Sequence, residues 1–244
     1  MGKLTKEEVI ARATSPRQYD EGEIDWVHTY GAKDDPTRLF ILEYLRENLT
    51  GLEGLNAIDI GCGTGYVSEL LFEFGAANVD GVEPSQNNVE IAQRLYPRLH
   101  VTQASLQDFE SHKKYDLALC VMVFEHILDI EGAFRKIGEL LNNGSKFYLV
   151  IGDKDIASRQ RFDYDVIAFE INKDTSAVAT YRPNSGMLYD IFHSVDSIVK
   201  AANKTGFLLE RHVQMLPTDD LIQRRPKYNE YRDQSICHLL IFKK

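Results

Sequence analysis

Three glycines at alternate positions follow a short apolar run near residue 58. The run Ile58-Asp59-Ile60 leads into Gly61-Cys62-Gly63-Thr64-Gly65, and residues at helical spacing come next. Glycine allows a tight turn and lets a ligand approach where a Cβ would clash, and the free N–H groups of the next helix favour an electron-rich ligand group. Twenty residues after Gly63, Glu83 ends the next apolar run, where it could accept hydrogen bonds from two ribose hydroxyls. This pattern predicts a nucleoside-binding pocket.

The spacing of these glycines distinguishes two nucleoside cofactors. A dinucleotide site favours G-x-G-x-x-G, whereas this chain has G-x-G-x-G, with Asp59 two residues before the first glycine. A carboxylate at the end of a buried strand is costly unless it is paired, and an ammonium group would pair it where a pyrophosphate would not. S-adenosylmethionine (SAM), a nucleoside that carries an amino acid, is therefore favoured over NAD.

The elements that must position these residues alternate between strand and helix. Apolar runs and segments at helical spacing alternate between residues 37 and 152, which predicts a parallel α/β sheet. After residues 153–193, which show no clean periodicity, Ser194 is expected to cap a helix, and two further strands are expected to pair at the sheet edge. The predicted strands are 56–60, 79–82, 99–102, 115–122, 146–151, 207–213 and 236–242.

Several of these segments resemble the motifs of the class I SAM-dependent methyltransferases, in their small-molecule branch. The similar segments are 59–65, 81–85, 103–109, 115–127 and 133–144. The resemblance covers about residues 37–152, with the final helix and strand pair. It implies a doubly wound, mostly parallel seven-stranded sheet of the Rossmann-like methyltransferase fold. It also implies an N-terminal helical arm or lid over 1–36 and a SAM-binding domain over 37–244, with an acceptor-binding insert at 153–193.

The resemblance also implies the cofactor contacts. Asp59, Gly61 and Gly63 would line the methionine end of SAM, and Glu83 would hold the ribose. Ser105 stands where the family often has a carboxylate toward the adenine, and the backbone N–H of Leu106 could serve the same base. The expected cofactor-binding residues are Asp59, Gly61, Cys62, Gly63, Gly65, Glu83, Pro84, Ser105, Leu106 and Val121.

Methyl transfer is an in-line displacement, so the protein must align the acceptor, exclude water and, for a hydroxyl, remove a proton. Glu125 and His126 follow the fourth strand and are expected as base or orienting groups; a capping or structural role is the alternative. His193 is a third catalytic candidate. Aromatic and histidine side chains of the arm and insert are expected to bind the acceptor or to close over a cationic ligand, unless they only pack these segments onto the domain. They are Tyr19, Trp26, His28, Tyr30, Tyr181 and Tyr189.

Composition limits the partners. Lys and Arg total 28 against 37 Asp and Glu, and the net charge of −9 disfavours nucleic acid. The three cysteines fit neither a disulfide framework nor a metal site, the histidines lack metal-ligand spacing, and no apolar run approaches the ~20 residues of a membrane span. We therefore expect a cytoplasmic monomer or homodimer without a metal, a membrane or a nucleic-acid partner.

Together these features predict a SAM-dependent methyltransferase that acts on an oxygen or nitrogen atom of a small molecule and releases S-adenosylhomocysteine. The alternative is a SAM-binding regulatory or scaffold protein without transfer activity. A nucleotide-dependent oxidoreductase is a more distant alternative, because the glycine spacing departs from the dinucleotide pattern.

Overall fold

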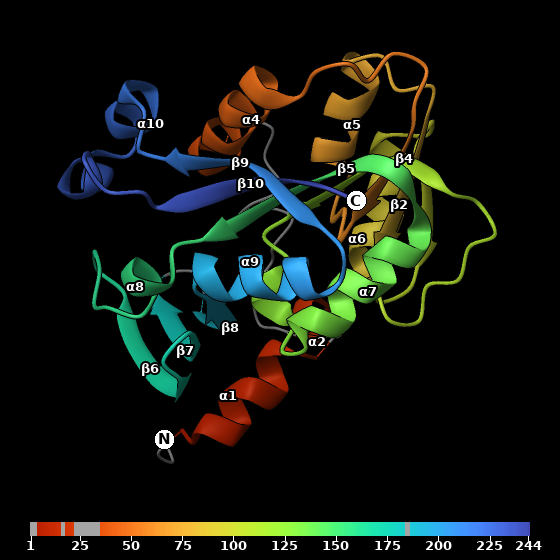
Figure 1. The fold of residues 1–244 in the computed structure, drawn as a ribbon. Helices are drawn as coiled ribbons and strands as arrows, with labels where there is room; N and C mark the ends of the chain where they lie inside the picture. Colours follow the sequence, from red (N-terminus) through yellow and green to blue (C-terminus); the bar gives the residue numbers. More distant parts are fainter. Residues whose placement is uncertain (1–3, 16–17, 22–34, 184–185) are drawn as a thin grey trace.

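A seven-stranded sheet forms the centre of the computed structural model, which describes residues 4–15, 18–21, 35–183 and 186–244. The strand order is β3-β2-β1-β4-β5-β10-β9, and β10 runs antiparallel to both of its neighbours while the other strands are parallel (Figure 1). This topology confirms the predicted doubly wound, mostly parallel sheet and the antiparallel pair at its end. The strands are β1 (Asn56–Ile60), β2 (Asn78–Glu83), β3 (His100–Gln103), β4 (Tyr115–Val121), β5 (Leu141–Gly152), β9 (Leu208–Met215) and β10 (Cys237–Lys243).

Helices cover both faces of the sheet because successive strand residues are apolar on opposite sides. In β1, Ala57 packs with one helical layer and Ile58 with the other, and neither side chain is more than 1% exposed. The carboxyl ends of the parallel strands therefore meet at one edge, where the loops after β1, β2 and β4 converge. The first layer contains α4 (Pro36–Asn48), α5 (Tyr66–Glu73) and α6 (Gln86–Leu95), and the second contains α7 (Ile130–Leu140) and α9 (Val195–Lys204).

Side-chain caps fix where the site-bearing helices begin. Ser85 Oγ accepts a hydrogen bond from Asn88 N at 3.2 Å and starts α6 directly after Glu83. Asp35 Oδ1 accepts from Thr37 N at 2.9 Å at the start of α4. The predicted Ser194 cap of α9 is confirmed by the bond from Ser197 N to Ser194 Oγ at 3.2 Å. Such caps satisfy backbone N–H groups that a helix leaves unpaired.

The insert after β5 folds as a second, three-stranded antiparallel sheet in the order β6-β7-β8, preceded by a short helix α8. The structure explains why the sequence of residues 153–193 shows no clean alternation of polar and apolar residues. The middle strand β7 is buried on both faces, with Ala177, Val178 and Ala179 fully buried, so it shows no alternation of polar and apolar residues. The elements are α8 (Lys154–Ala157), β6 (Asp165–Asn172), β7 (Thr175–Arg182) and β8 (Gly186–His193).

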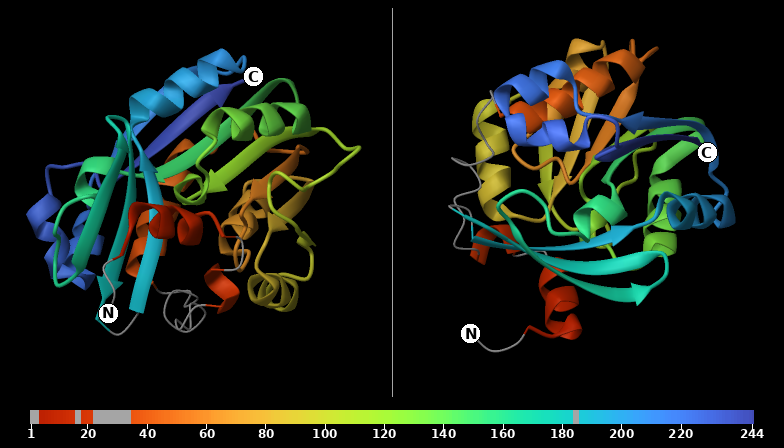
Figure 2. Two further views of the ribbon diagram at one scale, coloured as in Figure 1. Left: turned by 90° about the horizontal axis from the view of Figure 1, so that it is seen from below. Right: turned by 90° about the vertical axis from the view of Figure 1, so that its left-hand side faces the viewer.

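The described part of the N-terminal arm forms two helices, α1 (Lys6–Ala13) and α2 (Gln18–Glu21). Val9 of α1 is fully buried against Ala177 and Ala179 of β7, so this helix covers the insert sheet. Figure 2 shows α1 beside the insert strands, with α2 continuing toward the central domain. The arm thus joins the insert to the edge of the sheet where the loops converge.

Two short elements close the remaining side of that edge. They are α10 (Asp219–Arg224) and η2 (Pro226–Tyr231), in the long connection between β9 and β10.

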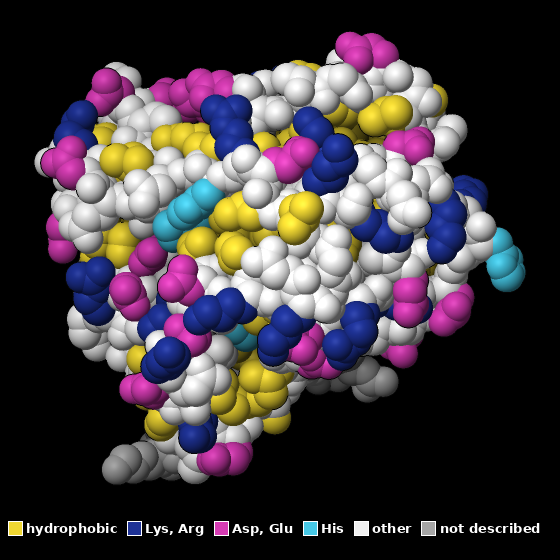
Figure 3. Space-filling model, in the orientation of Figure 1, with side chains coloured by type: hydrophobic (Ala, Val, Ile, Leu, Met, Phe, Trp, Pro, Cys, Tyr) yellow, Lys and Arg dark blue, Asp and Glu magenta, His cyan; other side chains and the backbone are white. Residues whose placement is uncertain are grey.

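On the face drawn in Figure 3, Lys and Arg side chains are interspersed with Asp and Glu side chains. None of the helices in the described ranges combines the length and the apolar character that a membrane span requires.

Candidate active site

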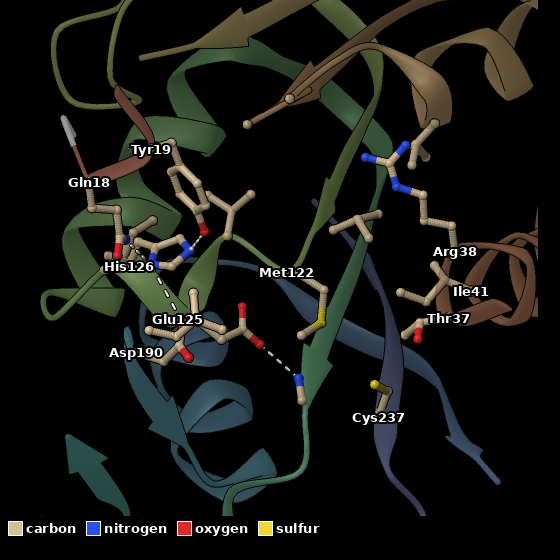
Figure 4. Close-up of a pocket in the computed structure, with 18 of the residues that line it drawn as sticks. Gln18, Tyr19, Thr37, Arg38, Ile41, Met122, Glu125, His126, Asp190 and Cys237 are labelled. Carbon is tan, nitrogen blue, oxygen red and sulfur yellow. Dashed lines mark hydrogen bonds and ion pairs between the residues drawn. The ribbon is translucent and has the colours of Figure 1, made fainter. Parts of the chain in front are cut away.

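A cavity of about 670 Å³ lies at the carboxyl edge of the parallel strands. Its walls come from the loops after β1, β2 and β4, from the arm, from the insert and from the connection between β9 and β10. Pockets of this size accommodate a cofactor or a drug-sized ligand together with a few placed polar groups. Figure 4 shows part of this cavity, with Arg38 on one side and Glu125, His126 and Asp190 on the other.

The glycine loop forms an open cradle in one wall of the cavity. All three glycines adopt positive φ, with Gly61 at 68°, Gly63 at 53° and Gly65 at 85°. A Cβ on Gly61 would lie 2.3 Å from Val123 Cγ2, whereas a Cβ on Gly63 would meet no atom within 4 Å. Gly61 therefore permits close packing, and Gly63 leaves space into which a ligand can come. Gly65 precedes α5 and packs against Tyr96 and Leu99, away from the cavity lining.

Asp59 provides a buried carboxyl group beside this cradle. It is 1% exposed and accepts a hydrogen bond from Ser68 Oγ at 2.6 Å. Burial raises the pKa of Asp59 to about 7, with the Ser68 bond opposing the shift and the nearby Glu83 charge adding to it. Within the described ranges no cationic side chain lies within 4.0 Å of Asp59. An ammonium group from a ligand would supply the missing partner.

This raised pKa makes the stability of the protein depend on pH. Between the ordinary pKa of an aspartate and about 7, the folded state holds a proton at Asp59 that the unfolded state has lost, so the stability falls as the pH rises through this window. Between pH 5.5 and 7 we expect the free energy of unfolding of the wild type to fall by about 1.5 kcal/mol because of Asp59. Asp59→Asn should not show this contribution, so its Tm should fall less than the wild-type Tm between the two pH values. Thermal unfolding at both pH values tests this, with the exposed Asp233→Asn as control; equal Tm drops in wild type and Asp59→Asn would contradict it.

Glu83 ends β2 with its carboxylate held by the loop next to it. Its Oε2 accepts from Gly63 N at 2.9 Å, and its Oε1 accepts from Ser85 N at 3.0 Å and from Asn88 Nδ2 at 3.3 Å. Burial raises the pKa of Glu83, and these three hydrogen bonds oppose the shift. The carboxylate is thus oriented toward the cavity before any ligand binds, with lone-pair capacity left for hydroxyl donors.

The arm covers this region through Asp20 of α2. Asp20 accepts hydrogen bonds from Ser85 Oγ at 2.7 Å and from the backbone N–H groups of Gln86 and Asn87, each at 3.2 Å. Because these groups open α6, the negative charge of Asp20 lies at the positive end of the helix dipole. The arm is therefore attached on the same side of the cavity as Glu83.

The segment after β3 lines another wall. Ser105 Oγ donates to Asp108 Oδ2 at 2.6 Å, and Ser105, Leu106 and Asp108 all line the cavity. Asp108 places a carboxylate next to Ser105, the only polar side chain of this segment that was predicted from the sequence to contact the cofactor. Its signal in the sequence is the three-residue spacing to Ser105, which lets the serine hydroxyl accept from Asp108 N at 3.2 Å. Cys62, Pro84 and Val121 also line the cavity.

Glu125 lies in the turn η1 (Phe124–His126), directly after β4. The turn follows Met122, a non-glycine residue with φ of 56°, a strained conformation that is frequent at functional sites. Glu125 Oε1 accepts from Gly152 N at 2.7 Å, while its buried Oε2 has no hydrogen-bond partner among the described residues. Burial raises the pKa of Glu125 to about 8. This carboxyl group can therefore gain or lose a proton near neutral pH.

His126 is held by the arm through both ring nitrogens. Gln18 Nε2 donates to His126 Nδ1 at 2.9 Å, and Tyr19 Oη lies 2.6 Å from His126 Nε2 (Figure 4). With Nδ1 accepting, the neutral ring carries its proton on Nε2 and donates it to Tyr19. Burial lowers the pKa of His126, against the charge of Asp190, whose Oδ1 lies 4.0 Å from Nδ1. A neutral His126 thus fastens α2 over the cavity.

Other predicted site residues lie away from the cavity. His193 is 5% exposed, and its Nε2 donates to Ile127 O at 2.8 Å while Nδ1 accepts from Thr175 Oγ1 at 3.3 Å. Tyr181 is 43% exposed on β7. Tyr189 packs against the arm, with the Arg12 guanidinium 5.0 Å from its ring centroid. These side chains do not line the cavity. Trp26, His28 and Tyr30, which were also predicted to bind the acceptor, lie outside the described residues.

The cavity is also lined by side chains that the sequence motifs do not indicate. Arg38 of α4 lies with its guanidinium 4.1 Å from the centroid of the Tyr66 ring, next to the glycine loop. No local pattern marks these residues, because they come together only when separate elements pack around the cavity. The others are Arg161, Phe162, Tyr164, Arg182, Asp190, Tyr228 and Tyr231. In the part of the chain that the structure describes, no group of three His, Cys, Asp or Glu side chains is arranged to hold a metal ion.

A family model covers most of the chain, whereas two curated relatives align with 39% and 48% of it. A family model described as a methyltransferase domain matches residues 25–223. A ubiquinone biosynthesis O-methyltransferase of Azorhizobium caulinodans is 34% identical over 100 residues, which are 39% of each chain. One of Chelativorans sp. is 30% identical over 138 residues, which are 48% of this chain and 51% of that protein. The matches thus span two fifths to a half of the length of these relatives.

Solved structures share the fold at low sequence identity. A SAM-dependent methyltransferase from Mesorhizobium loti is similar with a TM-score of 0.68 and 19% identity, over 86% of this chain and 100% of that one. The PH0226 protein from Pyrococcus horikoshii has a TM-score of 0.68 at 16% identity, over 93% and 98%. A 1,6-didemethyltoxoflavin N1-methyltransferase from Burkholderia thailandensis, solved with S-adenosylhomocysteine, has a TM-score of 0.60 at 12% identity, over 100% and 92%. These likenesses agree with the predicted Rossmann-like methyltransferase fold.

Proposed function

The chain belongs to the methyltransferase-domain family, of the class I SAM-dependent type that its motifs resemble, and from this premise we propose that it methylates a small molecule. The proposed reaction moves a methyl group from SAM to an oxygen or nitrogen atom of the acceptor and releases S-adenosylhomocysteine. The observation that carries the proposal is that the glycine loop, Glu83 and Glu125 line one cavity of about 670 Å³. That volume admits a cofactor and a small acceptor together.

The residues at the glycine-loop end fit SAM chemically. Asp59, buried without a cationic partner among the described side chains, would pair with the ammonium group. Glu83 would accept hydrogen bonds from the ribose hydroxyls, and Arg38 would face the methionine carboxylate. When bound, SAM supplies a methyl group that is already activated on a sulfonium. The protein therefore has to orient the acceptor and manage its proton.

At the opposite end, Glu125 is the proposed proton acceptor. Its Oε1 is fixed by Gly152 N at 2.7 Å, which leaves Oε2 able to take the proton of an acceptor hydroxyl. His126, held by Gln18 and Tyr19, would act as a positioning residue that closes α2 over the reacting atoms and excludes water. The presence of this proton acceptor favours a hydroxyl over an amine, in keeping with the O-methyltransferase names of the curated relatives.

We propose a separate role for each of three segments of the chain. Residues 1–36 would form the lid, 37–244 the SAM-binding domain, and 153–193 the acceptor-binding part. The packing of α1 on β7 and the place of Arg161, Arg182 and Asp190 in the cavity wall support this division. The net charge of −9 supports a small-molecule acceptor over nucleic acid, and three buried free cysteines support a reducing, cytoplasmic setting. The chain is still predicted to be a monomer or a homodimer.

Product analysis tests this proposal directly. The purified chain is incubated with SAM and a broad panel of small phenols and amines, and S-adenosylhomocysteine is quantified by mass spectrometry. We expect acceptor-dependent formation of S-adenosylhomocysteine, and a rise in Tm with SAM but not with NAD. Tight SAM binding without product over the whole panel would contradict transfer and favour the regulatory alternative. A rise in Tm with NAD but not with SAM would contradict the assignment of SAM as the cofactor.

A further inference from the structure

Two segments of the chain contribute walls of the cavity and lie side by side next to Glu125. Gly152, whose N–H donates to Glu125 at 2.7 Å, is paired with Cys237, where β5 ends and β10 begins. From Gly152 one segment continues through α8 to Phe162, and from Cys237 the other runs back along the connection between β9 and β10 to Tyr228. Both segments therefore start beside the proposed proton acceptor.

The two segments meet again at an aromatic cluster. The Phe162 ring has its centroid 5.5 Å from that of Tyr164 in its own segment, and 5.1 Å and 5.4 Å from those of Tyr228 and Tyr231 in the other segment. All four residues line the cavity, and the rings meet edge to face, an arrangement that stabilises aromatic pairs. Lys227 Nζ lies 4.7 Å from the centroid of Phe162. Phe162 thus closes the space between the two segments at the place farthest along both of them from Glu125.

Phe162 has a backbone conformation that is unusual for its side chain. Its φ is 57°, in the left-handed region that glycine occupies freely and that a bulky residue rarely adopts. Such strain persists only where the surrounding contacts hold it, and it is frequent at functional sites. Because glycine suits this conformation, Phe162→Gly relieves the strain at the same time as it removes the ring.

The stretch between Glu125 and the aromatic cluster suits an apolar part of a ligand. Two charged side chains of this stretch have partners within the protein, since Asp153 Oδ2 accepts from His238 Nε2 at 3.0 Å and Arg161 donates to two carbonyl groups at the end of α8. Apolar side chains line the cavity between them, namely Ile156, Ala157 and Ile236. Shape and apolar contact therefore decide what fits here.

We propose that Phe162 determines the length of the acceptor. The reacting hydroxyl would lie at Glu125, the apolar part of the acceptor between the two segments, and its end against the Phe162 ring. This inference rests on the proposed function, because it concerns the acceptor of the same cavity. Each methylene group that is buried between the segments should tighten binding about fourfold, until the acceptor meets Phe162.

A series of acceptors that differ only in length tests the proposal. Titration calorimetry in the presence of S-adenosylhomocysteine measures the Kd of 4-alkylphenols whose chains have one to eight carbon atoms. We expect the affinity of the wild type to increase about fourfold per methylene up to a limiting length and to rise no further beyond it. In Phe162→Gly and Phe162→Ala the limit should move to chains at least two carbon atoms longer. An unchanged limit in both variants, or no limit in the wild type, would overturn the proposal.

A matched control separates a removed end wall from a general loss of packing. Phe169→Ala removes the same side chain from β6, where Phe169 packs against the buried cluster of Val9, Ala177 and Ala179 and does not line the cavity. It should keep the wild-type limit even if its Tm is lower. A limit that moves in Phe169→Ala as well would assign the effect to loosened packing and would overturn the role of Phe162.

Cofactor binding distinguishes this inference from the proposed function. Both Phe162 variants should bind SAM with a Kd within threefold of the wild-type value, because Phe162 is not among the groups proposed to hold SAM. A wild-type chain that binds S-adenosylhomocysteine but none of the alkylphenols would overturn the inference. Failure of the wild type to bind SAM would instead contradict the proposed function.

Discussion

Glu83→Ala is expected to weaken SAM binding about 100-fold. Two ribose hydroxyls donating to one carboxylate form charge-assisted hydrogen bonds, and losing them costs about 2.7 kcal/mol, which corresponds to a factor of about 100 in Kd. The carboxylate is already oriented by Gly63 N and Ser85 N, so little of this energy is spent on ordering it. Titration calorimetry with SAM measures the change.

The alanine variant also removes a partner from Gly63 N and Ser85 N, so its fold needs a separate check. Glu83→Gln keeps one acceptor oxygen but turns its NH2 group toward the N–H of either Gly63 or Ser85, so it is expected to lose about tenfold in SAM affinity and to have a lower Tm than the wild type. Glu90→Ala removes an exposed carboxylate from α6, the helix that follows Glu83, and should bind SAM as the wild type does. Folded Glu83 variants with a Kd within threefold of the wild type would show that the ribose lies elsewhere.

Glu125→Gln is expected to lower kcat at least 100-fold while the Kd of SAM changes less than threefold. General base catalysis contributes about 10²–10⁴ in rate, and an amide cannot take the proton of the acceptor. The glutamine oxygen can still accept from Gly152 N, so the turn after β4 should keep its shape. Single-turnover rates with the best acceptor of the phenol panel measure the effect.

The rate of the wild-type enzyme is also expected to depend on pH through Glu125. Glu125 must be ionised to accept a proton, and its pKa is raised to about 8, so wild-type kcat should rise as the pH increases through about 8. Glu125→Gln should lose this rise, while Glu110→Gln, an exposed control, should keep it. A Glu125→Gln enzyme with more than a third of the wild-type kcat would remove Glu125 from the proton transfer.

The cofactor half of the site could be predicted because its signals are local. The strand predicted at 56–60 is β1, and the glycines at 61, 63 and 65 all adopt the positive φ that their turn requires. Glu83 ends β2 as expected, because the strand and the Ser85 cap of α6 adjoin it in the sequence. Local spacing and turn chemistry are enough where the residues of a site follow one another along the chain.

The insert could not be predicted in the same way. Ala177, Val178 and Ala179 are buried on both faces of β7, so the strand lacks the alternation by which a half-exposed strand is recognised. One of those faces is covered by α1, which lies more than 150 residues earlier in the chain. The burial pattern of β7 is thus set by a partner that no local window contains.

The contacts at the acceptor end of the cavity could also be predicted only in part from the sequence. The strand-end rule predicted that Glu125 and His126 reach the cavity edge, yet it could not predict that Gln18 and Tyr19 occupy both nitrogens of His126. Tyr181 and Tyr189 of the insert are predicted to bind the acceptor from their residue type alone. In a β-strand successive side chains point to opposite faces, so the neighbours Arg182 and Asp190 line the cavity instead.

We propose that the cofactor and the acceptor meet in one cavity between Glu83 and Glu125. A crystal structure of the chain with S-adenosylhomocysteine tests it most directly. We expect the ribose hydroxyls within hydrogen-bond distance of Glu83, the ammonium group next to Asp59, and the sulfur atom open toward Glu125. A nucleoside bound elsewhere, or a sulfur atom that faces away from Glu125, would show that Glu83 and Glu125 do not serve one methyl-transfer site.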